Sequence, residues 1–189
     1  MPCKIIMQKS LAKNSIYNII YTVVNILFPF ATSIYVSRIL LPAGVGKVAS
    51  AQNIVSYFVT IAALGLPSYG VREFAKIREN KRERNKLFTE LFLLNIVSTT
   101  LAVLGFLVLL IINMGFHGEW ALYGVCGLAI VFNYLNIDWM YMGLEEYGYI
   151  TGRSLLIKVV SLVLLLLVVK TKQDYVLYAL ITSLATGGN

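Results

Sequence analysis

The stretch LFLLNIVSTTLAVLGFLVLLIINMGF, residues 91–116, decides the fold class of this chain, because it runs for 26 residues without a charge. A helix that crosses a bilayer needs about 20 mostly apolar residues, since the hydrocarbon core is about 30 Å thick and a helix rises about 1.5 Å per residue. Residues 91–116 satisfy this requirement, so the sequence predicts a membrane-spanning helix here.

Further apolar stretches flank this one on both sides. Two uncharged runs of 24 residues precede it, at 14–37 and 48–71. The last run is only 15 residues long and falls below the usual spanning range of about 17–25. We therefore expect an all-α transmembrane bundle of five complete spans plus a truncated sixth, which makes the chain an N-terminal fragment of a longer protein. The expected spans are 14–37, 48–71, 88–113, 120–142, 154–170 and 175–189.

The composition agrees with this reading and excludes several other classes. Of 189 residues, 58% are apolar and 13% are charged, about half the roughly 25% that is usual for a soluble domain. Such hydrophobicity excludes a disordered chain, and two cysteines exclude a disulfide scaffold. A soluble nucleic-acid binder would share the net charge of +7 but not the apolarity, so no nucleic-acid partner is expected.

Basic residues are distributed unevenly between the segments that join the spans. Successive segments carry 3, 2, 7, 0, 2 and 2 Lys or Arg residues, so alternate sides hold 12 and 4 of them. Seven bases lie in residues 72–86, together with three glutamates. Because positive residues favour the cytoplasmic side, the N-terminus is expected in the cytoplasm, and residues 72–86 are expected to attract anionic lipid headgroups.

Polar residues inside the expected spans are candidates for function, because they are costly in hydrocarbon. In the first span these polar residues recur every three or four positions and so form one stripe along the helix. In the second span Gln52 shares one helical face with two hydroxyl residues, and Asn53 follows it in the chain. They predict either hydrogen bonds between helices or the wall of a sugar-tolerant, water-filled cavity. Pro29 is expected to kink the first span. The stripe consists of Asn18, Thr22, Asn25, Pro29 and Thr32.

Charged residues near the spans give a second set of candidates. Asp138 is expected either to pair with a base such as Arg153 or to serve in ion coupling or gating. The bases expected at the inner helix ends, Arg72, Arg153 and Lys158, would suit either simple anchoring or an anionic lipid-linked cargo, and Arg38 is expected at the outer end. With one histidine, His117, and no metal-ligand or phosphate-loop pattern, neither enzyme activity nor a cofactor or metal is expected.

Several short stretches also resemble the polysaccharide-unit flippases, the O-antigen and capsule flippases of the multidrug/oligosaccharidyl-lipid/polysaccharide exporter superfamily. The resemblance extends over nearly the whole chain and depends on the set rather than on any single piece. The stretches are KNSIYN (13–18), YVSRIL (35–40), GVGKV (44–48), AQNIVSYF (51–58), LGLPSYGVRE (64–73), DW (138–139) and GLEEY (143–147).

This resemblance implies a transporter of the bacterial inner membrane with two pseudo-symmetric lobes, of which the chain would supply most of the N-terminal one. It implies movement of undecaprenyl-pyrophosphate-linked oligosaccharide units from the inner to the outer leaflet by alternating access. The implied partners are that substrate, membrane lipids and other polysaccharide-assembly proteins. Two alternatives stay open: a multidrug cation antiporter of the same superfamily, and a non-functional fragment, which we expect not to complement a flippase deletion by itself.

Overall fold

The computed structural model describes residues 2–112 and 118–187, and their side chains from residue 14 onward. His117 and the last two residues of the expected sixth span lie outside these ranges. The described residues form helices without any strand, so the all-α prediction is confirmed. The helices are α1 (Pro2–Ala63), α2 (Leu66–Lys76), α3 (Lys81–Ile112), α4 (Trp120–Phe132), the short 3-10 helix η1 (Asn133–Leu135), α5 (Asp138–Gly143), α6 (Tyr147–Val168) and α7 (Tyr175–Gly187).

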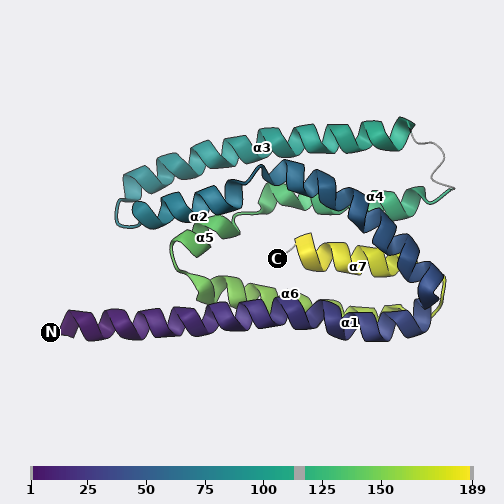
Figure 1. The fold of residues 1–189 in the computed structure, drawn as a ribbon, viewed down its shortest axis with the longest axis horizontal. Coiled ribbons are helices and arrows are strands. Elements are labelled where there is room, and N and C mark those ends of the chain that lie inside the picture. Colours follow the sequence, from purple (N-terminus) through teal and green to yellow (C-terminus); the bar gives the residue numbers. More distant parts are fainter. Residues whose placement is uncertain (1, 113–117, 188–189) are drawn as a thin grey trace.

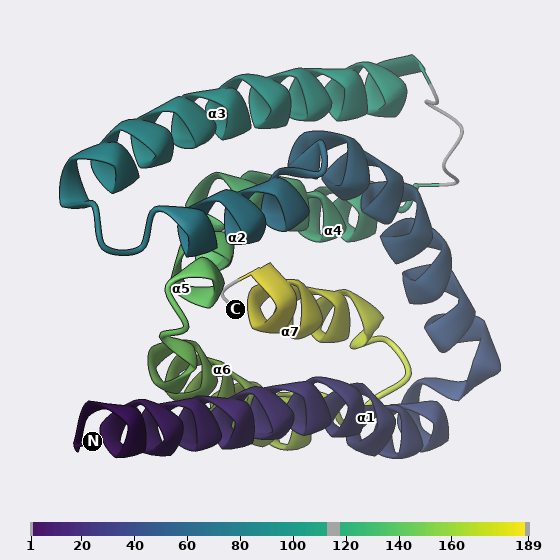
Figure 2. The ribbon, with the colours of Figure 1, turned by 60° about the vertical axis from the view of Figure 1, so that its left-hand side comes forward.

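The helices form a bundle in which α7 lies in the middle (Figures 1 and 2). The first half of α1 runs beside α6, and its second half crosses to pack on α3 and α4. The short helices α2 and α5 pack on each other beside the first half of α3. This arrangement leaves α7 in contact with α4, α6 and α1.

Helix α1 is bent at Leu41, which has a left-handed φ of 58° and a ψ of 168°. The next residue is Pro42, and a proline disfavours the helical conformation of the residue before it. The expected loop between the first two spans is therefore a single-residue break. At Pro29 the described α1 keeps helical dihedral angles, since Leu41 is the residue that departs from them. The Thr32 hydroxyl donates to the Phe28 and Pro29 carbonyls at 3.0 and 3.1 Å. The kink expected at Pro29 stays a prediction.

Two expected spans are interrupted. The chain leaves helical geometry at Leu64 (φ 46°) and Gly65 (φ 72°), so the stretch 48–71 divides between α1 and α2. The stretch 120–142 divides in the same way, because Asn136 is extended (φ −74°, ψ 100°) between η1 and α5. Neither stretch is therefore one continuous helix. The number of complete membrane crossings stays a prediction.

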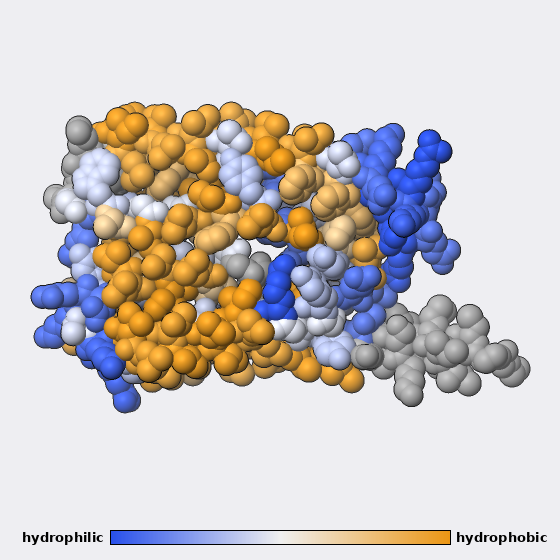
Figure 3. All heavy atoms as spheres, turned by 180° about the vertical axis from the view of Figure 1, so that it is seen from behind, coloured by the Kyte–Doolittle hydropathy of each residue, from blue (hydrophilic) through white to orange (hydrophobic). Residues whose placement is uncertain are grey.

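Three helical segments are long and apolar enough to cross a membrane: Asn14–Lys76, Lys81–Ile112 and Tyr147–Val168. Two shorter apolar segments, Trp120–Leu135 and Tyr175–Gly187, accompany them. Seen from behind, an apolar surface occupies the middle of the molecule and hydrophilic surface lies at its two ends (Figure 3). Apolar side chains such as Leu93, Leu156 and Ile26 point outward and are more than half exposed, as expected for a surface that meets lipid.

The two ends of the bundle carry the two alternating sets of connections. The turn between α2 and α3, the junction of α5 with α6 and the start of α1 lie at one end (Figure 1). The bend of α1, the start of α4 and the turn between α6 and α7 lie at the other (Figure 1). The base-rich and base-poor segments of the sequence therefore occupy opposite ends of the structure.

Helix α5 approaches α2 closely at a glycine. A Cβ atom added at Gly143 would lie 2.5 Å from Phe74 Cβ and 2.9 Å from the Val71 carbonyl oxygen. Because backbone atoms cannot rotate away, we expect Gly143→Ala to destabilise the protein by about 1–3 kcal/mol and to lower its thermal midpoint in detergent. Gly152→Ala on α6 is the matched control, because its Cβ would meet nothing within 4 Å. Equal losses in the two variants would contradict this packing.

Candidate functional site

A lysine is buried between the two long helices α1 and α6. Lys158 is 6% exposed, and its ammonium group donates a hydrogen bond to the Asn25 side-chain oxygen. The same group lies 5.9 Å from the centre of the Phe28 ring. Among the described residues, no carboxylate pairs with this lysine. A buried charge inside a spanning helix is costly and usually marks a functional position.

Five residues before Lys158, closer to the base-rich end, Arg153 of α6 pairs with Asp138 at the start of α5. The two side chains are 26% and 11% exposed. The predicted pairing of Asp138 with Arg153 is thus present. Two further polar atoms here, Arg153 Nε and the Ser154 hydroxyl, are buried without a partner in the described part of the chain. Together with Lys158, these groups make this part of α6 cationic and rich in hydrogen-bond donors.

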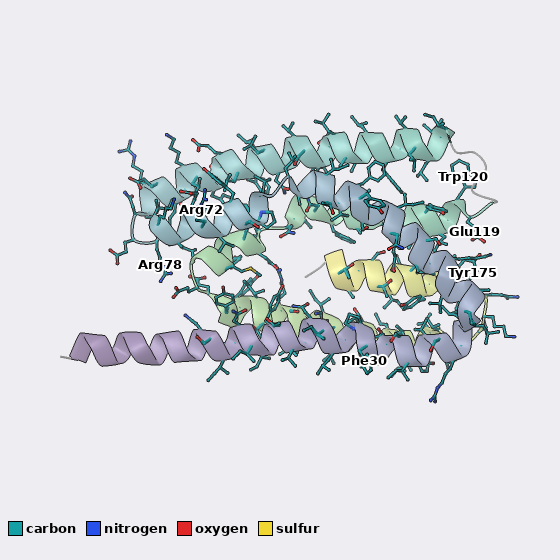
Figure 4. All side chains as sticks on the ribbon, viewed as in Figure 1. Phe30, Arg72, Arg78, Glu119, Trp120 and Tyr175 are labelled. Atoms are coloured by element: carbon teal, nitrogen blue, oxygen red, sulfur yellow. The ribbon has the colours of Figure 1, made fainter. Side chains whose placement is uncertain are left out.

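The other two predicted arginines lie elsewhere. Arg72 is 66% exposed, bonds Glu73 at 3.0 Å and lies 5.6 Å from the centre of the Tyr69 ring. It projects at the base-rich end of the bundle, near Arg78 (Figure 4). Arg38 is exposed near the bend of α1. In the described structure no contact joins Arg72 to Arg153 or Lys158, so the inner basic group that the sequence indicated divides into an exposed part and a buried part.

The polar stripe of the first span also divides. Asn25 contacts Lys158 and Thr32 is buried, whereas Asn18, Thr22 and Pro29 are exposed. The exposed Thr22 hydroxyl returns to its own helix and bonds the Asn18 carbonyl at 2.9 Å. Helix α6 therefore covers only part of this stripe, and the rest of the stripe stays exposed.

A pocket of about 390 Å³, mostly apolar but with several neutral polar side chains in its wall, lies between the second half of α1, α4 and α7. The predicted face of Gln52, Ser56 and Thr60 lines one wall, so these three side chains do share a surface. Gln52 donates a hydrogen bond of 3.0 Å to the Thr182 hydroxyl of α7. Asn53 is exposed and does not line this pocket. The other lining residues are Val55, Val59, Cys126, Ala129, Ser183 and Thr186.

Hydroxyl groups of α7 were missed as candidates by the sequence reading. Ser183 and Thr186 are three residues apart and therefore lie on one side of α7, toward α1. Their signal in the sequence is the spacing of Thr182, Ser183 and Thr186 within an otherwise apolar helix. The pocket thus combines amide and hydroxyl groups from two helices and contains no charged residue among its lining side chains.

A second polar group lies where α1 and α4 end. Asn95 of α3 donates to the Asn133 carbonyl at 2.9 Å, and the Asn133 amide donates to Asn95 at 3.0 Å and to Thr99 at 2.8 Å. The Ser98 hydroxyl donates to the Ala62 carbonyl at 2.6 Å. All of these side chains are buried, so α3 supplies the hydrogen bonds that the interrupted helices lack.

At the base-poor end, Glu119 links three helices through hydrogen bonds. Glu119, just before α4, accepts a 2.6 Å bond from Lys47 of α1 and a 2.7 Å bond from the Tyr175 hydroxyl of α7. Figure 4 shows Glu119 and Tyr175 at this end. The hydrogen bond from Lys47 is the main reason that the pKa of Glu119 is lowered, and the same bond raises the pKa of Lys47.

This cluster predicts how stability changes with pH. Because the pKa of Glu119 is lowered, its contribution is complete above the ordinary value of 4.5 and is lost as the pH falls through the lowered pKa. Because the pKa of Lys47 is raised, its contribution is complete below 10.5 and is lost as the pH rises through the raised pKa. We expect the thermal midpoint to exceed that of Glu119→Gln at neutral pH and to converge with it in acid. A constant difference down to pH 3 would contradict this assignment.

The described residues contain no group of three or more His, Cys, Asp or Glu side chains that could hold a metal ion. They do contain a buried cationic group on α6, an uncharged pocket with amide and hydroxyl groups beside α7, and long apolar helices around both. These features define a class of protein: a multi-pass membrane protein with polar groups placed inside the bundle, as in transporters.

A comparison with protein families shows which family within this class the chain matches. Residues 11–187 match the family described as polysaccharide biosynthesis protein, which covers nearly the whole chain. The chain belongs to this family, whose members are transporters of the flippase type, and the resemblance seen in the sequence is confirmed. No curated protein and no solved structure matches the chain significantly.

Proposed function

We propose that this chain forms part of a transporter that moves undecaprenyl-pyrophosphate-linked oligosaccharide units from the inner to the outer leaflet of the bacterial inner membrane. The observation that carries the proposal is the buried Lys158, held by the neutral Asn25 inside a spanning helix. A cation that has no carboxylate partner among the described residues suits an anionic cargo, and membership of the polysaccharide family supports a lipid-linked oligosaccharide as that cargo.

The two polar regions suit the two parts of such a cargo. Lys158 and Arg153 offer ammonium and guanidinium groups for the pyrophosphate. The pocket lined by Gln52, Ser56 and Thr60 offers neutral amide and hydroxyl groups, which match the hydroxyl groups of sugars. Asp138, paired with Arg153, is the candidate gating group, because a pyrophosphate that engages Arg153 would compete for the same guanidinium. Alternating access between two lobes would then carry the cargo across.

The distribution of bases supports an orientation with the N-terminus in the cytoplasm. The base-rich end, which contains the turn between α2 and α3, would face the cytoplasm. The cationic part of α6 begins near this end, with Arg153 seven residues into the helix. The pyrophosphate would therefore meet Arg153 first and Lys158 deeper in the bilayer.

Gene deletion and complementation test this proposal against the drug-antiporter alternative. Loss of the whole protein should abolish surface polysaccharide, accumulate lipid-linked units on the inner leaflet, and leave drug tolerance unchanged. The pairing of Asp138 with Arg153 favours the first outcome, because a cationic drug needs a free carboxylate. Normal surface polysaccharide together with lost drug tolerance would favour the antiporter and overturn the proposal.

A further inference from the structure

Two tyrosine rings lie against each other where α5 meets α6, at the base-rich end of the bundle (Figure 1). The ring centres of Tyr141 and Tyr149 are 4.8 Å apart, and the two rings are tilted by 31°. Tyr149 is 56% exposed, so more than half of its surface remains accessible after this contact. The pair therefore offers an aromatic surface to a ligand.

The ion pair of Asp138 and Arg153 adjoins these rings. Asp138 and Tyr141 are three residues apart on α5, and Tyr149 and Arg153 are four residues apart on α6, so each pair shares one helical face. The ring contact and the ion pair bring the two faces together. The guanidinium carbon of Arg153 lies 5.9 Å from the centre of the Tyr149 ring. We call the surface of these four side chains the α5–α6 surface.

The α5–α6 surface matches the chemistry of a pyranose ring. One face of a pyranose presents C–H groups, which suit the negative face of an aromatic ring, and its edge carries hydroxyl groups, which bond carboxylates and guanidinium groups. Ligand sites of this kind combine aromatic walls with a few placed polar groups. Membrane anchoring, the ordinary role of an exposed tyrosine near a helix end, needs only a ring beside lipid headgroups. The mostly buried ion pair beside Tyr149 is an addition that anchoring does not require.

A second exposed tyrosine at the same end illustrates the simpler case. Tyr69 is 45% exposed and lies 5.6 Å from the guanidinium carbon of Arg72. The Arg72 side chain is itself 66% exposed, whereas the Arg153 side chain is 26% exposed. Tyr69 therefore resembles an interfacial tyrosine beside a solvated base, and it provides a matched control for Tyr149.

We propose that Tyr149, supported by Tyr141, stacks on the sugar that is bonded directly to the pyrophosphate. This inference rests on the proposed function, in which Arg153 binds the pyrophosphate. The first sugar must then lie beside Arg153, and the Tyr149 ring is placed there. The sugar is a gluco-configured pyranose, because its equatorial hydroxyl groups leave a face of C–H groups toward the ring. Sugars further along the unit remain candidates for the pocket beside α7.

Calorimetric titration of the whole protein in detergent tests this proposal with two probes. The first is a short-chain isoprenoid pyrophosphate, and the second is the same molecule carrying one gluco-configured hexose. Tyr149→Leu removes the ring but keeps an apolar side chain, Tyr149→Phe keeps the ring, and Tyr69→Leu is the matched control. Because both tyrosines are exposed, the variants should fold, and binding of the sugarless probe checks this directly.

We expect the unsubstituted protein to bind the sugar-bearing probe about three- to tenfold more tightly than the sugarless one, which is the size of an aromatic contact of this kind. Tyr149→Leu should lose this preference and bind the sugarless probe as before. Tyr149→Phe and Tyr69→Leu should keep the preference.

Four results would each overturn the proposal: no preference in the unsubstituted protein, an undiminished preference in Tyr149→Leu, an equal loss in Tyr69→Leu, or loss of sugarless binding in Tyr149→Leu. In all four the unsubstituted protein still binds the pyrophosphate, so the proposed function stands. If the unsubstituted protein binds neither probe, the proposed function fails, and this inference fails with it.

Discussion

Replacing Lys158 by glutamine in the whole protein should lower surface polysaccharide at least about tenfold, which corresponds to about 1.4 kcal/mol of lost stabilisation along the transport reaction. The reason is that the ammonium group is the buried cation that the proposed pyrophosphate would meet inside the bilayer. Glutamine keeps a hydrogen-bond donor for Asn25, so the contact between α1 and α6 should persist. The measurement is surface polysaccharide per amount of inserted protein.

Two further variants separate charge from structure. Lys158→Arg keeps the cation and should retain part of the transport. Lys170→Gln removes an exposed lysine just beyond the other end of the same helix and should have no effect. Normal transport by Lys158→Gln at normal protein levels would remove Lys158 from the mechanism, and an equal loss in Lys170→Gln would show that the effect is general.

The second large effect is expected at the Arg153–Asp138 pair. Asp138→Asn leaves the Arg153 guanidinium without its carboxylate in a mostly buried position, and we expect a loss of about 1–3 kcal/mol, reduced from the value for fully buried pairs by partial exposure. The double variant Asp138→Asn/Arg153→Gln should recover most of this loss, because no uncompensated charge remains. Thermal midpoints in detergent give both values.

The exposed pair Arg78–Glu145 provides the matched control. Its side chains are 41% and 35% exposed, so Glu145→Gln should cost less than about 1 kcal/mol. If Asp138→Asn costs no more than Glu145→Gln, or if the double variant is less stable than Asp138→Asn, the pair does not stabilise this junction of α5 and α6 as described.

The sequence predicted the helical class and the apolar stretches, but it did not predict where the helices break. A count of uncharged residues treats 120–137 as continuous, because Asn133 and Asn136 do not interrupt an uncharged run. At this interruption Asn133 exchanges hydrogen bonds with Asn95 of α3 and donates one to Thr99 of α3, and these partners are 34 to 38 residues away in the chain. Likewise, Leu41 looks like any other helical residue until the effect of Pro42 on it is considered.

The sequence predicted only part of the candidate site, because it does not show which helices pack against each other. The spacing of Gln52, Ser56 and Thr60 determines that they share a face, and that face does line a pocket. The partners of the charges were predicted in part: Arg153 pairs with Asp138, 15 residues away, as one expectation had it. Arg72, which was expected at the inner helix ends with Arg153 and Lys158, is instead bonded to its neighbour Glu73. The packing of α6 on α1 determines which basic residues are buried. The periodicity of a single helix cannot predict this packing.

The most direct test of the central claim is translocation of the cargo by the purified whole protein in lipid vesicles. A fluorescent undecaprenyl-pyrophosphate-linked oligosaccharide is placed in the outer leaflet, and its access to an external glycosidase is followed over time. We expect the glycan to become protected with time, and we expect no such protection in vesicles without protein or in vesicles with Lys158→Gln. Protection no faster than in vesicles without protein, from folded and inserted protein, would contradict it.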